Sequence, residues 1–137
     1  MCKDLINRYV KNYGNGLYVV FRVIVGYLFF AHGAGKLFGV LGGPGPFEVM
    51  SLMGLAGIIE TLVGLGIFFG VFSRLASIGG LAVMIGALIT QHIPKGINPM
   101  TNGGELALIY LAVFLTILAN GNGKLSLEKK VLKKEVF

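Results

Sequence analysis

Charged residues are scarce in this chain, and their scarcity argues against an ordinary soluble domain. Only 13% of the 137 residues are charged, whereas about a quarter is usual in soluble globular proteins. Hydrophobic residues make up 55%, and the mean hydropathy is +0.80. Because these residues fall in long apolar runs, we expect an integral membrane protein in contact with the lipid bilayer.

Cysteine is also nearly missing, which excludes several kinds of redox centre. Cys2 is the single cysteine, so neither an internal disulfide nor a Cys-x-x-Cys motif can form. The chain has no dinucleotide-binding glycine fingerprint, and its 22 glycines follow no collagen-like repeat. We therefore expect no metal site, no covalently bound cofactor and no self-sufficient redox enzyme.

Basic residues are present in excess, but they lie outside the apolar runs. The formal net charge is +6. Of the 12 lysines and arginines, all but Lys36 and Lys95 fall on one side of a four-span topology. This asymmetry predicts a multi-pass protein of the plasma membrane with both termini in the cytoplasm, and it fits anionic lipid rather than nucleic acid.

The apolar runs predict an all-α fold, a membrane-spanning four-helix bundle made of one domain over residues 1–137. Ahead of them, residues 3–13 form an amphipathic pattern typical of a helix at the membrane surface, ended by Gly14-Asn15-Gly16; a frayed terminus is the alternative. Ser73-Arg74 is expected to be a short turn. The last apolar run, 106–119, is shorter than the roughly twenty residues that a span needs. The spans are predicted at about 17–40, 52–72, 75–93 and 105–120.

Glu60 is the feature around which we expect the site to form. It lies near the middle of the 52–72 span and shares a helical face with the small residues Gly57 and Gly64. A carboxylate at that depth costs about 2.5 kcal/mol or more, so it should face protein or water. His32 and Lys36 in the first span lie at a similar depth, and either one can be its partner.

A polar site in the outer half of the bundle is therefore predicted. The last span should turn Glu105 inward, together with Ile109 and Ala112. In the third span Gln91 falls on the small-residue face with Gly80, whereas His92 points away from it. The primary candidates are His32, Lys36, Glu60 and Glu105, and the secondary ones are Arg22, Arg74, Gln91 and His92.

Several spaced motifs resemble the DoxX family of small four-helix membrane proteins, from about residue 22 to residue 128. The first helix carries Arg22-x3-Gly26-x5-His32-Gly33-x2-Lys36-Leu37, and the second carries Gly57-x2-Glu60-x3-Gly64-x5-Gly70-x3-Arg74. Gly104-Glu105 precedes the last helix, and Gly121-x-Gly123-x2-Ser126-Leu127-Glu128 follows it, with Glu where the family usually has Asp.

The resemblance implies a four-helix bundle with both termini inside. Relatives include a small subunit of a thiosulfate:quinone oxidoreductase and partners of membrane-associated redox complexes, while other members have no settled activity. No catalytic residue is carried over, because bundle packing explains the matching positions equally well.

Three functions are consistent with the chain. The first is a membrane subunit of a quinone-linked oxidoreductase, with protein partners and quinone as its cofactor. The second is a non-enzymatic membrane scaffold or chaperone. The third is a small proton-coupled exporter, which the strong charge bias disfavours. The sequence leaves homo-oligomerisation open.

Overall fold

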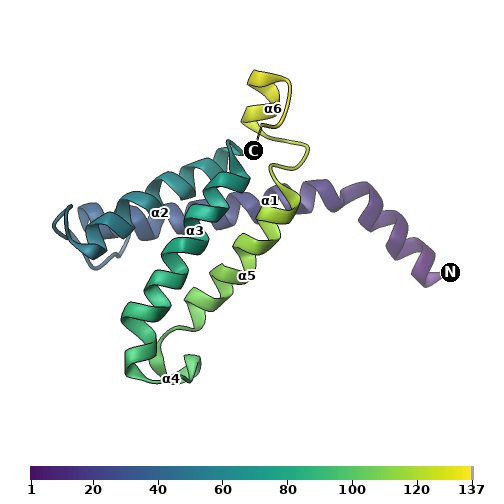
Figure 1. Ribbon diagram of the computed structural model, residues 1–137. Helices are drawn as coiled ribbons and strands as arrows, with labels where there is room; N and C mark the ends of the chain where they lie inside the picture. Colours follow the sequence, from purple (N-terminus) through teal and green to yellow (C-terminus); the bar gives the residue numbers. More distant parts are fainter. Residues whose placement is uncertain (137) are drawn as a thin grey trace.

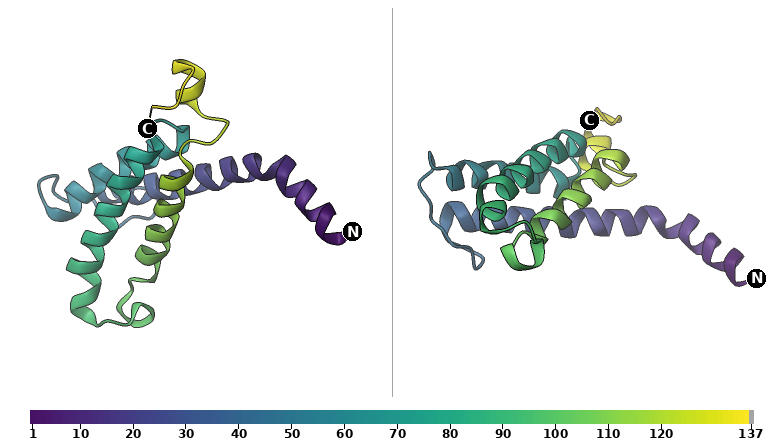
Figure 2. Two further views of the ribbon diagram at one scale, coloured as in Figure 1. Left: turned by 45° about the vertical axis from the view of Figure 1, so that its right-hand side comes forward. Right: turned by 60° about the horizontal axis from the view of Figure 1, so that its bottom comes forward.

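Two antiparallel helix pairs form the molecule. The computed structural model describes residues 1–136, which fold into helices and loops without any strand. One pair consists of the first two long helices, and the other consists of the last two. The pairs splay apart from the turn that connects them (Figures 1 and 2). The four long helices are α1 (Cys2–Phe38), α2 (Leu52–Phe69), α3 (Ser73–Ala87) and α5 (Glu105–Asn120).

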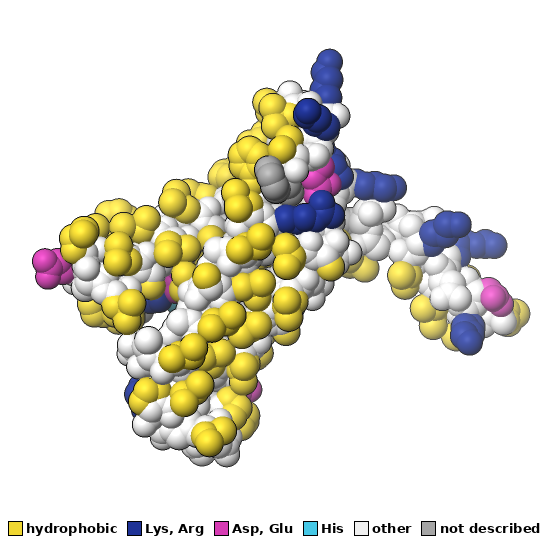
Figure 3. Space-filling model, in the orientation of Figure 1, with side chains coloured by type: hydrophobic (Ala, Val, Ile, Leu, Met, Phe, Trp, Pro, Cys, Tyr) yellow, Lys and Arg dark blue, Asp and Glu magenta, His cyan; other side chains and the backbone are white. Residues whose placement is uncertain are grey.

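The two ends of this arrangement differ in character. At the α2–α3 turn the two pairs meet the chain's C-terminal segment, and we call this the basic end. Lys and Arg side chains gather there and along the beginning of α1 (Figure 3). At the other end the pairs are separated, and we call this the open end.

The N-terminal segment does not form a separate helix, which corrects the expected break at Gly14-Asn15-Gly16. Helix α1 runs without interruption from Cys2 to Phe38 and ends at Gly39 in a left-handed conformation. Glycine inside a helix costs about 1 kcal/mol relative to alanine but leaves every backbone hydrogen bond intact, so it weakens a helix without ending it. Figure 1 shows the first turns bending away from the axis of the rest.

The turn between α2 and α3 lies earlier than expected. Helix α2 ends at Gly70, and Phe72 is also left-handed, so that Ser73 is already the first residue of α3. Ser73-Arg74 is therefore the start of a helix rather than the turn itself. The direction of the chain reverses as predicted, because the two helices remain antiparallel neighbours.

The end of the third span is wound differently from its beginning. Helix α3 passes into a π-helical turn, Leu88–His92, and then into a 3-10 turn, Ile93–Lys95. A π turn holds one more residue than an α turn and so rotates the positions that follow it. The connection to α5 then contains the short helix α4 (Pro99–Asn102).

Glycines bring α1 and α2 into backbone contact. A Cβ added at Gly26 would lie 2.4 Å from the Phe68 nitrogen, and one added at Gly64 would lie close to the backbone of Phe30. Gly64 thus faces α1. Gly80 of α3 faces α5, where its missing side chain makes room for the ring of Phe114.

Helix α5 buries a face other than the one predicted. Glu105, Ile109 and Ala112 are exposed in the structure. A uniformly apolar helix offers little contrast between its faces, and the expectation that small residues face inward failed because the glycine of α3 accepts an aromatic ring. The buried residues of α5 are Ala107, Tyr110, Phe114 and Ile117.

Three helical stretches are long and apolar enough to cross a bilayer: Cys2–Phe38, Leu52–Phe69 and Ser73–Lys95. Helix α5 is equally apolar but has 16 residues, so a fourth crossing is not established by length. Hydrophobic side chains are spread over the face of both helix pairs that Figure 3 shows. The structure is thus a helical membrane protein whose outer surface suits lipid contact.

Candidate functional site in the open end

Glu60 and Lys36 form an ion pair between α2 and α1. The Lys36 Nζ atom lies 2.6 Å from Glu60 Oε1. The Glu60 side chain is 2% exposed, whereas Lys36 keeps 16% of its side chain exposed. Of the two partners that the sequence left open for Glu60, the structure brings Lys36 within bonding distance.

The pair uses only one of the two carboxylate oxygens. Glu60 Oε2 is buried and has no hydrogen-bond partner among residues 1–136. A carboxylate oxygen without a donor is costly in an apolar setting. The site therefore retains a strong acceptor that a bound molecule can use.

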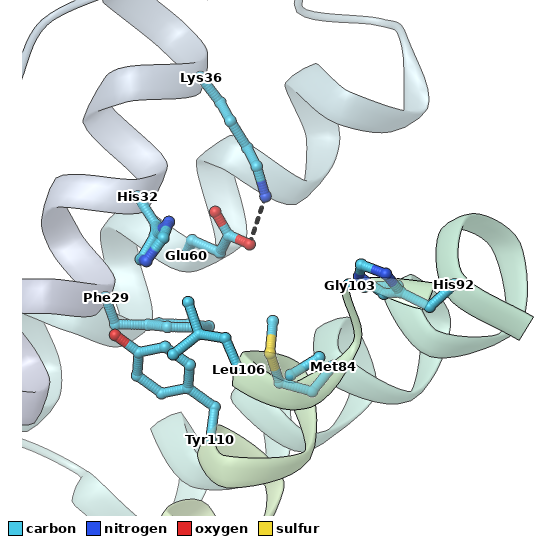
Figure 4. Close-up of a pocket in the computed structure, with 11 residues that line it drawn as sticks. Phe29, His32, Lys36, Glu60, Met84, His92, Gly103, Leu106 and Tyr110 are labelled. Carbon is cyan, nitrogen blue, oxygen red and sulfur yellow. Dashed lines mark hydrogen bonds and ion pairs between the residues drawn. The ribbon is translucent and has the colours of Figure 1, made fainter. Parts of the chain in front are cut away.

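The pair borders a pocket of about 210 Å³ between the two helix pairs. Phe29 and Tyr110 form its aromatic side, with their ring centroids 5.2 Å apart. His32 stands edge-on to the Tyr110 ring, at 5.9 Å between centroids. Figure 4 shows Lys36, Glu60 and His32 on one side of the pocket and Tyr110, Leu106 and Met84 on the other.

An apolar groove of about 580 Å³ lies beside this pocket, between α2 and α3. The two hollows share Lys36, Ala87 and His92 as lining residues. Most of the groove is aliphatic, with Leu55 and Ile59 among its lining residues. The site therefore offers a small polar chamber next to a larger apolar surface.

The third span contributes His92 to the pocket, although the sequence pattern predicted that this side chain points away from the inward face. His92 lines the pocket, and its Nδ1 lies 3.1 Å from the Asn102 carbonyl oxygen. Gln91 is exposed and lines only the apolar groove. A regular α-helix was assumed for this stretch, and the π turn at Leu88–His92 changes the direction of the last residues.

Glu105 is not part of the pocket. It is the first residue of α5 and is exposed, while the next two residues, Leu106 and Ala107, line the pocket. The expected grouping of Glu105 with His32, Lys36 and Glu60 is wrong for the same reason that the inward face of α5 was misassigned.

Arg22 lies at the basic end, far along α1 from the pocket. It is 3% exposed, and its Nη1 donates a hydrogen bond to the Asn122 carbonyl. The Asn122 side chain in turn donates to Glu128, and its own oxygen accepts from the Ser73 N–H.

A further set of contacts attaches the C-terminal segment to the same place. Arg74 donates from Nε to the Leu118 carbonyl at 3.1 Å, and its Nη1 is 3.7 Å from Glu135. Glu135 also pairs with Lys129 at 3.0 Å and accepts from the Asn122 N–H at 2.8 Å. Burial raises the pKa of Glu135, but the Asn122 hydrogen bond and Lys129 outweigh it and hold the pKa below its ordinary value. We call residues Arg22, Asn122, Glu128 and Glu135 the clamp.

Sequence reasoning missed Tyr110 in the pocket and Asn122 in the clamp. Tyr110 is the single tyrosine of its apolar run, and that polar group offered a usable signal. Asn122 stands between two glycines just after the last predicted span. Its partners lie as far as 100 positions away in the sequence, so no local pattern reveals its role.

The pocket is suited to hydrogen bonding and proton exchange rather than to holding a metal. Among residues 1–136, no group of three or more His, Cys, Asp or Glu side chains is arranged to bind an ion. Lys36 supplies a donor, and Glu60 Oε2 supplies an acceptor. A ligand with both a donor and an acceptor can therefore be held by these two side chains.

Comparisons with known proteins identify relatives. Residues 17–93, more than half of the chain, match the DoxX family. A protein of Haemophilus influenzae described as uncharacterized is 33% identical over 120 residues, covering 82% of this chain and 89% of its own. "Putative oxidoreductase CatD" of Bacillus subtilis is 29% identical over 122 residues, covering 84% and 87%. No solved structure matches the chain. This chain therefore belongs to the DoxX family of membrane proteins.

Proposed function

We propose that this protein is a membrane subunit of a quinone-linked oxidoreductase complex and that the pocket beside Glu60 binds the quinone head group. The observation that carries the proposal is the buried Glu60 Oε2, which has no donor among residues 1–136, on a side chain that lines a 210 Å³ pocket. A quinol hydroxyl supplies that donor, while Lys36 donates to the carbonyl of the oxidised form.

The adjoining groove supports a ligand of this shape. A quinone has a flat polar head and a long apolar tail, and the chamber and groove present matching surfaces that share Lys36, Ala87 and His92. The aromatic rings of Phe29 and Tyr110 provide flat surfaces against which a head group can pack.

The chain's own contribution to the reaction is binding and proton handling. Glu60 and Lys36 hold opposite charges beside the head group, and His32 lines the same pocket. Electrons come from a partner subunit that carries a redox cofactor. The relative named "Putative oxidoreductase CatD" is consistent with this assignment.

Quinone binding by the purified protein tests the proposal. Decylubiquinol, kept reduced under anaerobic conditions and titrated in mild detergent, should bind the parent, and Glu60→Gln should weaken its binding about tenfold, since a charge-assisted hydrogen bond contributes about 1.5 kcal/mol or more. Glu105→Gln is the matched control, because it makes the same change at an exposed residue outside the pocket.

Two results would contradict the proposal. One is a parent protein that binds no decylubiquinol, and the other is an equal loss in both variants. If unrelated membrane proteins also copurify with the parent, the scaffold alternative replaces the redox subunit.

A further inference from the structure

A second hollow lies at the basic end, on the opposite side of the molecule from the Glu60 pocket. It is a groove of about 530 Å³ between the end of α2 and the segment that leads into α6 (Leu127–Leu132). Nothing in the proposed redox function uses it. Its lining combines positive charge with apolar surface.

The first chemistry is positive charge without a matching negative charge. Arg22, Lys124, Lys129 and Lys130 line the groove, and no acidic residue does so within the described part of the chain. Lys129 is held by the Gly123 carbonyl and by Glu135. Lys124 and Lys130 are exposed and form no ion pair with any residue from 1 to 136.

The second chemistry is apolar surface continuous with the spanning helices. Phe68 and Phe69 line the groove at the last turn of α2. Phe69 is 48% exposed, although it is one of the largest apolar side chains in the protein. A ligand in the groove therefore meets cations and, next to them, a surface suited to hydrocarbon.

Arg22 supplies an independent indication of a missing partner. Its Nη1 reaches the Asn122 carbonyl, but its Nε is buried and has no acceptor among residues 1–136. Only 3% of Arg22 is exposed. It forms no ion pair with the described residues. An arginine that is buried with an unused N–H is suited to a phosphate oxygen, which guanidinium groups bind in a defined geometry.

We infer that this groove binds the phosphate head group of an anionic phospholipid, with its acyl chains lying against Phe68 and Phe69. The basic end is where the surface of a bilayer meets these helices, since the charged residues follow the apolar spans there. Exposed Lys124 and Lys130 attract the phosphate, and Arg22 at the base of the groove fixes its position. The site is thus a lipid site built into the fold, distinct from general attraction between basic residues and the membrane.

The experiment uses the full-length protein in mild detergent. Dioctanoyl-phosphatidylglycerol is titrated and binding is counted by native mass spectrometry. The double variant Lys124→Gln with Lys130→Gln should weaken binding about thirtyfold, since each lysine beside an anionic lipid contributes about a factor of five. Lys133→Gln with Lys134→Gln is the matched control, because it removes two exposed lysines of the same segment that do not line the groove. This control should bind like the parent.

Each alternative outcome overturns the inference. Equal losses in both double variants would mean that net charge, not the groove, attracts the lipid, and no loss in either would mean that these lysines bind nothing. Dioctanoyl-phosphatidylcholine must bind at least tenfold more weakly. If inorganic phosphate at the lipid's concentration displaces phosphatidylglycerol, the site recognises a free anion and the assignment to a lipid fails.

Discussion

Two glutamates are almost completely buried in this protein, and the way their oxygens are used differs. Glu60 is 1% exposed and Glu128 is 2% exposed. Both oxygens of Glu128 accept hydrogen bonds: Oε2 from the Phe72 N–H and the Asn122 amide, and Oε1 from the Val136 N–H. Among residues 1–136, Glu60 accepts only from Lys36, through one oxygen.

Glu128 is a structural carboxylate whose two oxygens both accept hydrogen bonds, whereas Glu60 keeps one oxygen that can accept another. Glu128 joins the α2–α3 turn to the C-terminal segment, and each of its donors would be left unsatisfied without it. Glu60 holds two helices together through a cation that still reaches solvent. Burial is thus common to both glutamates, whereas the oxygen without a donor among residues 1–136 distinguishes Glu60 and supports the proposed role of its pocket.

The largest effect expected from this comparison is a difference in stability between two matched substitutions. Glu128→Gln replaces an acceptor oxygen with an amide that faces backbone donors, so it should lower the free energy of unfolding by about 3 kcal/mol. Glu60→Gln should cost about 1 kcal/mol, because partly exposed Lys36 can turn toward water. Helical melting in detergent, followed by circular dichroism, measures both. Equal losses would break the comparison.

A smaller effect is expected from a substitution that changes helix packing at the open end only. A Cβ added at Gly33 would lie 2.4 Å from the Thr61 nitrogen, so Gly33→Ala must push α1 and α2 apart one turn before Lys36. Overpacking of this kind costs about 1–3 kcal/mol and should also weaken quinone binding. Gly16→Ala is the control, since its new Cβ meets nothing within 4 Å. Decylubiquinone binding that survives in Gly33→Ala would show that the open end tolerates helix separation.

The smallest effect should be a pH dependence confined to the clamp. The pKa of Glu135 is lower in the folded protein than its ordinary value of 4.5, so its ionised form stabilises the fold. That stabilisation is complete above about pH 5 and is lost as the pH falls through the folded pKa. The melting temperature should therefore decline between pH 5 and pH 3.5, and slightly less in Glu135→Gln. An identical decline in both proteins would assign the effect to other carboxyl groups.

Much of the helical framework could be predicted because it depends on local signals. Apolar runs located the helices, and the gap between the first two predicted spans, 17–40 and 52–72, located the loop between α1 and α2. The glycines at 14 and 16 were misleading, since a helix-weakening residue was given the weight of a helix-ending one. Near-uniform hydrophobicity concealed the buried face of α5, where Tyr110 and Phe114 lie inward.

The candidate site was predictable in part. The depth of Glu60 in its span limited its partners to His32 and Lys36, and depth follows directly from the rise of a helix. The position of the His92 side chain was not predictable, because the π turn rotates the residues at the end of the third span and the hydrophobic pattern does not reveal a π turn. The clamp depends on contacts between distant parts of the chain, which no periodicity contains.

The length of α5 has a consequence for the membrane itself. Sixteen residues rise about 24 Å, which is about 6 Å less than a typical hydrocarbon core. A crossing by such a helix requires the bilayer to become thinner around it, at a cost of a fraction of a kcal/mol for each ångström of mismatch. Thinning next to α5 would bring interfacial water closer to the Lys36–Glu60 pair, and it would favour residence of the protein in thinner bilayers.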